Sequence, residues 1–461
     1  MSKPRLGANY WKLWSASVVS NFGDGLAIVA YPWLASAVTR SPLHLAGIAV
    51  ATRLPWAIFT LPAGVIADRV DRRKLIGWMN WFRFALTMVV AVAVTMGAGN
   101  VPDPADLAAG TASAPDHAAL YLVLIYAASL LLGLAEVLGD NAAQTLMPSV
   151  VAPAHLERAN GRLWGAEMVM NSFVGPPLAG LLIAAMLALP FYVDSATFAV
   201  AALLILSIRG DFRSNRTKTS VRTKIDWLGE IKEGVSWLWR HRVLRSLAIV
   251  LGLLNGLSMM SFSTYVFFVQ EILGLSAPQF GLLLTAGAVG GVVGSMLGAV
   301  ISARLGSGTS LFVAIGAMFL QAAVTGVTSS AIVVWVMFFI GTFWGVVWNV
   351  ITVSLRQQII PDDLLGRVNS VYRFFGWGMM PIGSLAGGLI VAGTEHVASR
   401  ELALRMPFLI EALILLGILV AAMSRLNTSQ IEAARAAAHS PGPVDSADPA
   451  SSGADSSPSS A

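Results

Sequence analysis

The chain has 461 residues, of which 56% are hydrophobic and only 12% are charged, and its mean hydropathy is +0.70. A soluble protein of this length needs a charged surface that such a composition cannot supply, so a large soluble enzyme is excluded and an integral membrane protein is predicted. The complete lack of cysteine also excludes disulfides, thiolate metal sites and thiol nucleophiles.

Twelve apolar segments separated by short polar turns follow one another along the chain. We place them at residues 11–37, 43–67, 75–98, 119–141, 160–187, 190–208, 246–272, 278–303, 310–329, 331–357, 367–393 and 406–424. Each can cross about 30 Å of hydrocarbon as a helix, and none shows the alternating polarity of a barrel strand. The sequence predicts an all-α integral membrane protein with twelve transmembrane helices in two six-helix halves, residues 1–208 and 246–426.

The basic residues, 30 against 25 acids, are concentrated in alternate loops. The opposite set of loops is nearly uncharged or, at 99–118, acidic. By the positive-inside rule, both termini lie in the cytoplasm and the protein is a multi-pass protein of the plasma (inner) membrane. This placement assigns the positive charge to membrane lipid and argues against nucleic acid as a partner. The first apolar run lacks a convincing cleavage site, so we expect it to remain as the first helix.

The first span contains an acidic residue, Asp24, in the stretch "NFGDGLAIVAY". An ionised group at membrane depth costs several kcal/mol unless it is paired or hydrated, so Asp24 is a functional candidate. Helical spacing places Asn21 and Tyr31 on the same face of the helix. Asn21 and Tyr31 therefore share one face of the first span with Asp24.

The turn after the second span reads "LPAGVIADRVDRRKLIG" and gathers unusual charge between two apolar runs. The positive-inside rule explains its basic residues but not the glycine and aspartate. The turn resembles the loop signature of the major facilitator superfamily, roughly G-x-x-x-D-R-x-x-R-[RK], carried here by Gly64, Asp68, Arg69, Arg72 and Arg73. The resemblance implies the major facilitator fold, with this loop as a latch between the halves. It also implies that helices one, four, seven and ten line the substrate cavity, so Asn21 and Tyr31 would border it together with Asp24.

The fourth span carries Glu136, Asp140 and Gln144 at successive spacings of four, which places them on one stripe of a helix. Two carboxylates one turn apart in a low dielectric repel each other, so one is expected to keep a proton near neutral pH. This pattern is typical of a proton carrier. Alternatively, Asp140 caps the helix or pairs with Arg158 or Arg162.

Glu167 is a further candidate for proton coupling, with an ion pair to an arginine as the alternative reading. The arginine that the family usually has in the fourth helix is missing here. Arg53 or Arg83 could take its place, although either could instead extend its charge to a membrane interface.

The fifth span, "EMVMNSFVGPPLAGLL", contains Gly175, Pro176 and Gly180. These residues are similar to the G-P-x-x-G-G antiporter signature of the drug-exporting branch, in which a kinked helix has a small-residue face for close packing. Pro177 and Ala179 depart from that signature, and a structural kink without any role in antiport is the competing account. The motif favours export over import.

Residues 209–245 separate the two halves. We predict a cytoplasmic basic loop with an amphipathic helix, in which Trp227, Leu228, Ile231, Val235, Leu238 and Trp239 recur at helical spacing. This helix either lies in the membrane interface or packs on the cytoplasmic ends of the bundle. The halves resemble each other: Gly47 and Gly64 match Gly281 and Gly298 at the same offset, and "LERANG" matches "LGRVNS". Parallel repeats with a ligand cavity between them are a transporter architecture.

The predicted cavity lining of the second half is neutral: Asn255, Met259 and Phe262 in the seventh helix, and Trp344, Trp348 and Asn349 in the tenth. Aromatic and methionine surfaces accept varied apolar or cationic ligands, although tryptophan in a membrane helix also serves for packing. Glu411 in the last span receives no assignment. The Ala-, Ser- and Pro-rich tail at 427–461 has almost nothing to bury and is predicted to be disordered.

The beginning, "NFGDGLAIVAYPWLA", and the stretch "EGVSWLWRHRVLRSL" are similar to actinobacterial tetracycline and aminoglycoside efflux proteins, and more loosely to macrolide and siderophore exporters. The resemblance implies a monomeric secondary transporter that exports amphipathic small molecules by proton antiport. The alternative is a facilitator or importer of a specific nutrient, and a scaffold without transport would leave the buried carboxylates without purpose. The sequence shows no enzyme motif and no Walker A loop, and we expect no cofactor and no metal.

Overall fold

The computed structural model describes residues 6–97, 101–210, 212, 227–425, 428–429 and 431–432. Within these residues all regular structure is helical, and twelve helical segments are long and apolar enough to cross a membrane. The predicted all-α, twelve-span membrane fold is therefore confirmed. The tail at 433–461 and most of the basic stretch before residue 227 lie outside the described residues.

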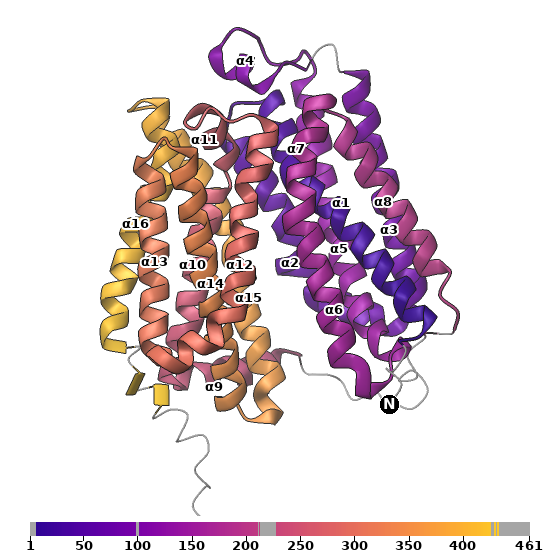
Figure 1. Cartoon of the computed structure of the whole chain (residues 1–461), viewed down its shortest axis with the longest axis vertical. Helices are drawn as coiled ribbons and strands as arrows, with labels where there is room; N and C mark the ends of the chain where they lie inside the picture. Colours follow the sequence, from indigo (N-terminus) through magenta and orange to yellow (C-terminus); the bar gives the residue numbers. More distant parts are fainter. Residues whose placement is uncertain are drawn as a thin grey trace, which may run out of the picture.

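The first half contains six spans (Figure 1). Five of these spans are single helices: α1 (Ala8–Val38), α2 (Pro42–Arg69), α3 (Arg72–Met96), α5 (Ala118–Val150) and α8 (Leu189–Leu206). The fifth span in chain order is composite: after the short turn η1 (Pro153–His155), it comprises α6 (Leu156–Met168), the π-turn segment η2 (Val169–Val174) and α7 (Gly175–Ala185). A short helix, α4 (Pro104–Ala109), lies at the end of the molecule opposite the N-terminus.

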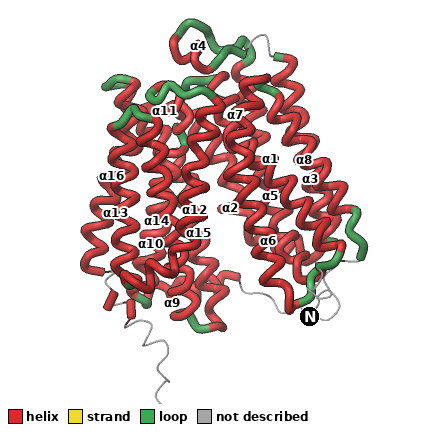
Figure 2. Tube along the Cα trace, viewed as in Figure 1, coloured by secondary structure: helices red, strands yellow, loops and turns green. Residues whose placement is uncertain are grey.

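The second half begins with a short helix, α9 (Trp227–Arg240), at the same end as the N-terminus (Figure 1). Its spans are α10 (Arg242–Phe262), α12 (Ala277–Leu305), α13 (Ser307–Val327), α14 (Ala331–Ile359), α15 (Asp362–Glu395) and α16 (Arg400–Arg425), and α11 (Tyr265–Glu271) continues α10 after a two-residue break. Figure 2 shows that the loops gather at the two ends of this helical body. We call these the α4 end and the α9 end.

The two halves share one hydrophobic core near the α4 end. Trp33 of α1 stacks on Phe280 of α12 with ring centroids 6.2 Å apart, and both belong to a buried cluster drawn from both halves. The other two clusters each belong to a single half, one around Tyr10 and one around Leu244. The halves are thus joined near the α4 end and also along α2 and α15, where Trp56 stacks on Trp377 with ring centroids 5.1 Å apart, and each half has one further core of its own.

Glycines of the predicted antiporter-type motif allow close backbone contact at this junction. A Cβ on Gly180 would lie 2.3 Å from the carbonyl oxygen of Ala277 in α12, so only glycine fits there. A Cβ on Gly175 would lie 2.5 Å from the Cα of Gly25 in α1. The π-turn segment η2 directly precedes Gly175 and supplies the irregularity expected of a kinked helix. The motif therefore packs the fifth span between α1 and α12.

The charged turn between α2 and α3 binds helix ends of its own half. Arg72 donates from Nη1 to the carbonyl oxygen of Thr145 at 3.0 Å, and Arg73 donates from Nη1 to that of Ile208 at 2.8 Å. The Ile208 carbonyl lies just beyond the C-terminal end of α8, where positive charge is favourable, and Thr145 lies near the C-terminal end of α5. Arg69 is exposed, and the surroundings of Gly64 and the side chain of Asp68 lie outside the part that is described. The latch between halves stays a prediction.

Helix α9 packs on the second half at the α9 end, which favours the second of the two readings of this helix. Arg367 of α15 pairs with Glu233 at 2.5 Å, a Cβ on Gly234 would lie 3.0 Å from the carbonyl oxygen of Arg367, and Leu238 is fully buried. Val235 and Trp239 remain exposed. One face of the helix is thus held by protein, and an apolar part of its surface is left open.

At the α4 end the halves are also joined by ion pairs. Arg40, between α1 and α2, pairs with Glu271 of α11 and donates to Gln270 Oε1 at 2.8 Å. Arg400 of α16 donates to the same Glu271 at 2.9 Å, and both guanidinium groups lie over the ring of Phe267, at 4.4 and 5.0 Å. Burial lowers the pKa of Arg40, and Glu271 opposes this effect by stabilising its charge. One carboxylate therefore holds an arginine from each half.

Removing this carboxylate should loosen the α4 end. We expect Glu271→Gln to raise the labelling rate of a cysteine placed at the buried, interfacial Ala277 about thirtyfold, because loss of one partner of a buried, hydrogen-bonded ion pair costs on the order of 2 kcal/mol. The natural chain has no cysteine, so labelling by a water-soluble maleimide reports this position alone. Glu401→Gln is the matched control, since Glu401 pairs only within α16, with Arg405 at 3.0 Å. Equal labelling in both variants would contradict the assignment.

Candidate transport cavities

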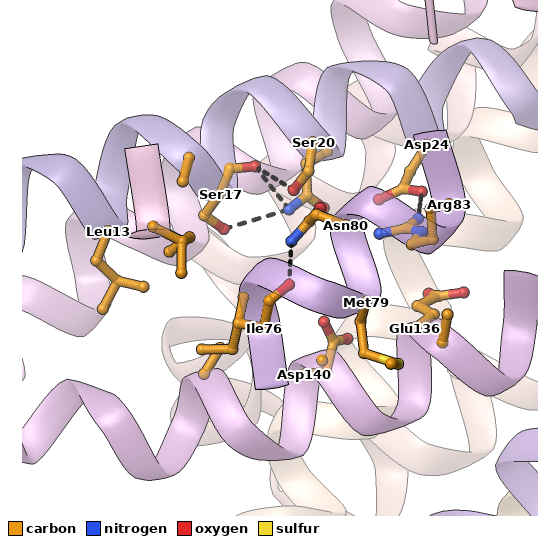
Figure 3. A pocket seen from close by; sticks show the side chains of 16 residues that line it. Leu13, Ser17, Ser20, Asp24, Ile76, Met79, Asn80, Arg83, Glu136 and Asp140 are labelled. Carbon is orange, nitrogen blue, oxygen red and sulfur yellow. Dashed lines mark hydrogen bonds and ion pairs between the residues drawn. The ribbon is translucent and has the colours of Figure 1, made fainter. Parts of the chain in front are cut away.

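Helices α1, α3, α5 and α8 of the first half enclose a small polar cavity of about 70 Å³, enough for a few water molecules. Figure 3 shows its charged side chains converging from three helices: Asp24 from α1, Arg83 from α3, and Glu136 with Asp140 from α5. Three of the four predicted proton-coupling candidates therefore line one cavity. We call it the first-half cavity.

Arg83 is the central cation of this cavity. It pairs with Asp24 (Figure 3), and its guanidinium lies 3.9 Å from the ring centre of Phe198 on α8. Only 7% of Arg83 is exposed, so its charge is stabilised by protein and not by bulk water. Of the two arginines considered as substitutes for the missing one, Arg83 lies at the carboxylates.

Besides Asp24, three carboxylates lie around this arginine: those of Glu136 and Asp140 line the same cavity, and that of Asp194 lies against Gly23, next to Asp24 in α1. We call Asp24, Glu136, Asp140 and Asp194 the acidic cluster. If all were ionised, the group would carry a net charge of −3, from one positive and four negative charges. Such a charge is prohibitively costly in a low dielectric, so the cluster must hold protons whenever external cations are absent.

The fourth candidate, Glu167 of α6, lies beside this cavity and accepts a hydrogen bond from the Ser17 hydroxyl at 2.5 Å. Asn21 donates to the carbonyl oxygen of Ser17 at 3.0 Å and lines the cavity. Glu167 thus has a hydroxyl as its partner and not the arginine considered as an alternative. Arg162, an alternative partner for Asp140, instead lies over the Trp11 ring at 5.7 Å.

Tyr31 lies away from the first-half cavity. It is 7% exposed and packs edge-on against Phe191 of α8 with ring centroids 5.1 Å apart, within the core near the α4 end. Helical spacing placed it correctly on a face shared with Asn21. Helical spacing could not show how far the cavity extends along that face, and the cavity ends before Tyr31.

Asp194 was missed by the sequence reasoning. It is 2% exposed, and its Oδ1 has no hydrogen-bond partner within the described residues. A Cβ on Gly23 of α1 would lie 2.2 Å from that oxygen, so the glycine makes room for the carboxylate. A sequence signal existed: "LPFYVD" at 189–194 matches "MPFLIE" at 406–411, which aligns Asp194 with Glu411.

A second and larger cavity of about 320 Å³ lies within the second half, between α10, α11, α13, α14 and α16. Four of the six residues predicted for this half line it: Asn255, Phe262, Trp348 and Asn349. Met259 and Trp344 are not among its lining residues. Its charged group is the unassigned Glu411, whose carboxylate accepts a hydrogen bond from the Ser261 hydroxyl. We call it the second-half cavity.

The two cavities occupy corresponding places in the repeat. Asn21 lies 234 positions before Asn255, the spacing that also relates Gly47 to Gly281, and it relates Asp24 to Ser258. The 209-position spacing of "LERANG" and "LGRVNS" relates Asp140 to Asn349. The second half has thus replaced two carboxylates with neutral polar groups and kept an acid only at the Asp194 position.

The family model of the Major Facilitator Superfamily matches residues 13–384, which is most of the chain. The chain belongs to the major facilitator superfamily. Its members are membrane transporters and not enzymes, so this assignment confirms the predicted fold and a small-molecule substrate.

Individual relatives agree with this assignment. The chain is 28% identical to the multidrug efflux pump Tap of Mycolicibacterium fortuitum over 423 residues, covering 89% of this chain and 95% of the pump. It is 27% identical to Tap of Mycobacterium tuberculosis, covering 84% of this chain and 88% of that one. Among solved structures, a bacterial homologue of the iron transporter ferroportin in an inward-facing state has the same fold, with a TM-score of 0.66 at 18% identity, covering 92% of this chain and 100% of the homologue.

The charge count of the acidic cluster predicts how stability depends on pH. We expect Arg83→Gln to lower the thermal unfolding midpoint at pH 8 by several degrees more than at pH 5.5. Without the arginine the cluster must hold more protons in the folded state than in the unfolded state, so stability falls as pH rises. Thermal unfolding of the purified protein measures this, with Arg162→Gln as the control. An equal decrease in the unfolding midpoint of Arg83→Gln at both pH values would refute the charge count of the acidic cluster.

Proposed function

We propose that the chain exports amphipathic small molecules, of drug-like or secondary-metabolite type, in exchange for protons. The observation that carries the proposal is the single arginine facing four carboxylates at membrane depth. Such a group cannot stay fully ionised, so it binds and releases protons as the access of water changes. The similarity to multidrug efflux pumps supports export as the direction of transport.

The orientation proposed is that of the positive-inside rule: the α9 end and both termini face the cytoplasm, and the α4 end faces outward in the plasma (inner) membrane. In this orientation the junction at the α4 end closes the molecule to the outside. The Arg72 and Arg73 contacts then hold the cytoplasmic ends of α5 and α8. A cysteine at Asp116 should react with an impermeant maleimide in intact cells, and one at Arg158 should not. The reverse pattern would invert the orientation.

Alternating access follows from how the two halves are joined. The contacts at the α4 end are the shared hydrophobic core, close glycine contacts and a small set of ion pairs, whereas elsewhere each half has a core of its own. Rocking of one half against the other would open the α4 end and close the α9 end. Both cavities belong to one chain, so a monomer suffices.

Proton-driven dye efflux tests the function. We expect a pH gradient to drive efflux of a fluorescent cationic dye from proteoliposomes, and Asp24→Asn or Glu136→Gln to reduce the gradient-driven rate at least tenfold, because each removes a proton site beside Arg83. Glu401→Gln, far from the cavity on α16, serves as the control and should retain the wild-type rate. Unfolding midpoints confirm that each variant is folded.

A facilitator or importer of a specific nutrient is the competing function. It predicts transport that persists without a gradient and is insensitive to both substitutions. That result would overturn proton antiport, because the acidic cluster would then be irrelevant to the driving force.

A further inference from the structure

Within the part of the chain that the structure describes, Glu411 in the second-half cavity has no cationic partner. It is 9% exposed, and its one hydrogen bond in the described residues comes from the Ser261 hydroxyl. The other polar lining groups are neutral, among them Asn255, Gln321 and Asn349, and no lysine, arginine or histidine occurs among the described residues that line this cavity. The first half differs sharply, because there Arg83 pairs directly with Asp24.

This difference matters because a buried carboxylate is costly without a counter-charge. One hydroxyl cannot replace the hydration of an ionised carboxylate, so Glu411 is stable only with a proton or with a cation that enters from outside. A cavity of about 320 Å³ around the carboxylate leaves room for more than a proton.

The walls of the cavity fit an organic cation better than a metal ion. Five aromatic side chains line it: Phe262, Tyr265, Phe338, Trp348 and Phe408. The Tyr265 ring lies 6.1 Å from that of Phe408 and 6.4 Å from that of Phe338, which forms a continuous aromatic surface. Aromatic faces attract cations and bind apolar groups, whereas a metal ion would need several charged or carbonyl oxygen ligands.

Trp348 adds a second polar requirement. It is 2% exposed, and its indole N–H has no acceptor within the described residues. A buried indole N–H ordinarily finds an acceptor, so a ligand or water with a lone pair fits here. A ligand that combines positive charge, apolar bulk and an acceptor satisfies every side of this cavity.

We propose that the second-half cavity is a binding subsite for a monovalent amphipathic organic cation, with its charge at Glu411 and its apolar part among the aromatic side chains. The proposal rests on the proposed function only in taking an amphipathic small molecule as substrate. It divides the tasks between the repeats: the acidic cluster of the first half holds protons, and the lone carboxylate of the second half holds the substrate cation.

Equilibrium binding to the purified full chain in detergent tests this without any gradient. The probes are methyltriphenylphosphonium and 1,1,1-triphenylethane, which are closely matched in shape, both lack a hydrogen-bond acceptor, and differ in charge. We expect wild type to prefer the cation, and Glu411→Gln to raise the Kd for the cation at least tenfold while changing the Kd for the neutral hydrocarbon less than about twofold. Glu401→Gln on the same helix, exposed and paired with Arg405, is the matched control and should bind as wild type does.

Glu411→Asp keeps a carboxylate and should retain the preference for the cation, which separates loss of charge from loss of folding. An unchanged Kd for the cation in Glu411→Gln, an equal weakening of both probes, or no binding of the cation by wild type would each overturn the proposal. If Glu411→Gln loses cation binding while the wild type shows no gradient-driven efflux, the binding result supports this site and the efflux result refutes proton antiport. The two proposals therefore fail separately.

Discussion

The pairing of Arg83 with Asp24 is the interaction on which the first half depends. An arginine that is 7% exposed cannot lose its charge, so neighbouring helices must supply carboxylates and an aromatic face. This requirement ties α1, α3, α5 and α8 together and accounts for Gly23, which leaves space for Asp194. The same requirement brings together more carboxylates than one arginine can balance. The carboxylates in excess must therefore hold protons, and this follows from the packing of the helices.

Comparison of the two halves separates what the repeat preserves from what it has changed. Both halves keep an asparagine on the first helix of the repeat and an acid after a Pro-Phe pair on the last. Only the first-half cavity has an arginine among its described lining residues, and the second half has neutral groups at the positions of Asp24 and Asp140. One architecture thus holds a compensated cluster of charges in one half and an isolated carboxylate among aromatic rings in the other.

Hydropathy was sufficient to predict the fold, because continuous apolar runs have no other stable form in a bilayer. The cost of buried charge likewise identified Asp24, Glu136 and Asp140, which do share a cavity. The pairing with Arg83 could not be chosen over Arg53, since it depends on how α3 packs against α1. Asp194 and Glu411 also lie within predicted spans, and the repeat of "LPFYVD" and "MPFLIE" relates them to each other. Met259 and Trp344 show the limit of helical spacing, which cannot fix where a cavity ends along a face.

The break between α10 and α11 connects the second-half cavity to the closed α4 end. Ser261, which holds Glu411, lies at the end of α10, and Tyr265, which lines the same cavity, begins α11. The other end of α11 carries Gln270 and Glu271, which bind Arg40 of the first half. Because α11 has only seven residues, a shift of Tyr265 cannot be absorbed within it before reaching Glu271. One short rigid helix, α11, therefore carries both a lining residue of the second-half cavity, Tyr265, and the ion-pair residue Glu271 at the α4 end. Such a link is the physical requirement for coupling occupancy of the cavity to separation of the halves at the α4 end.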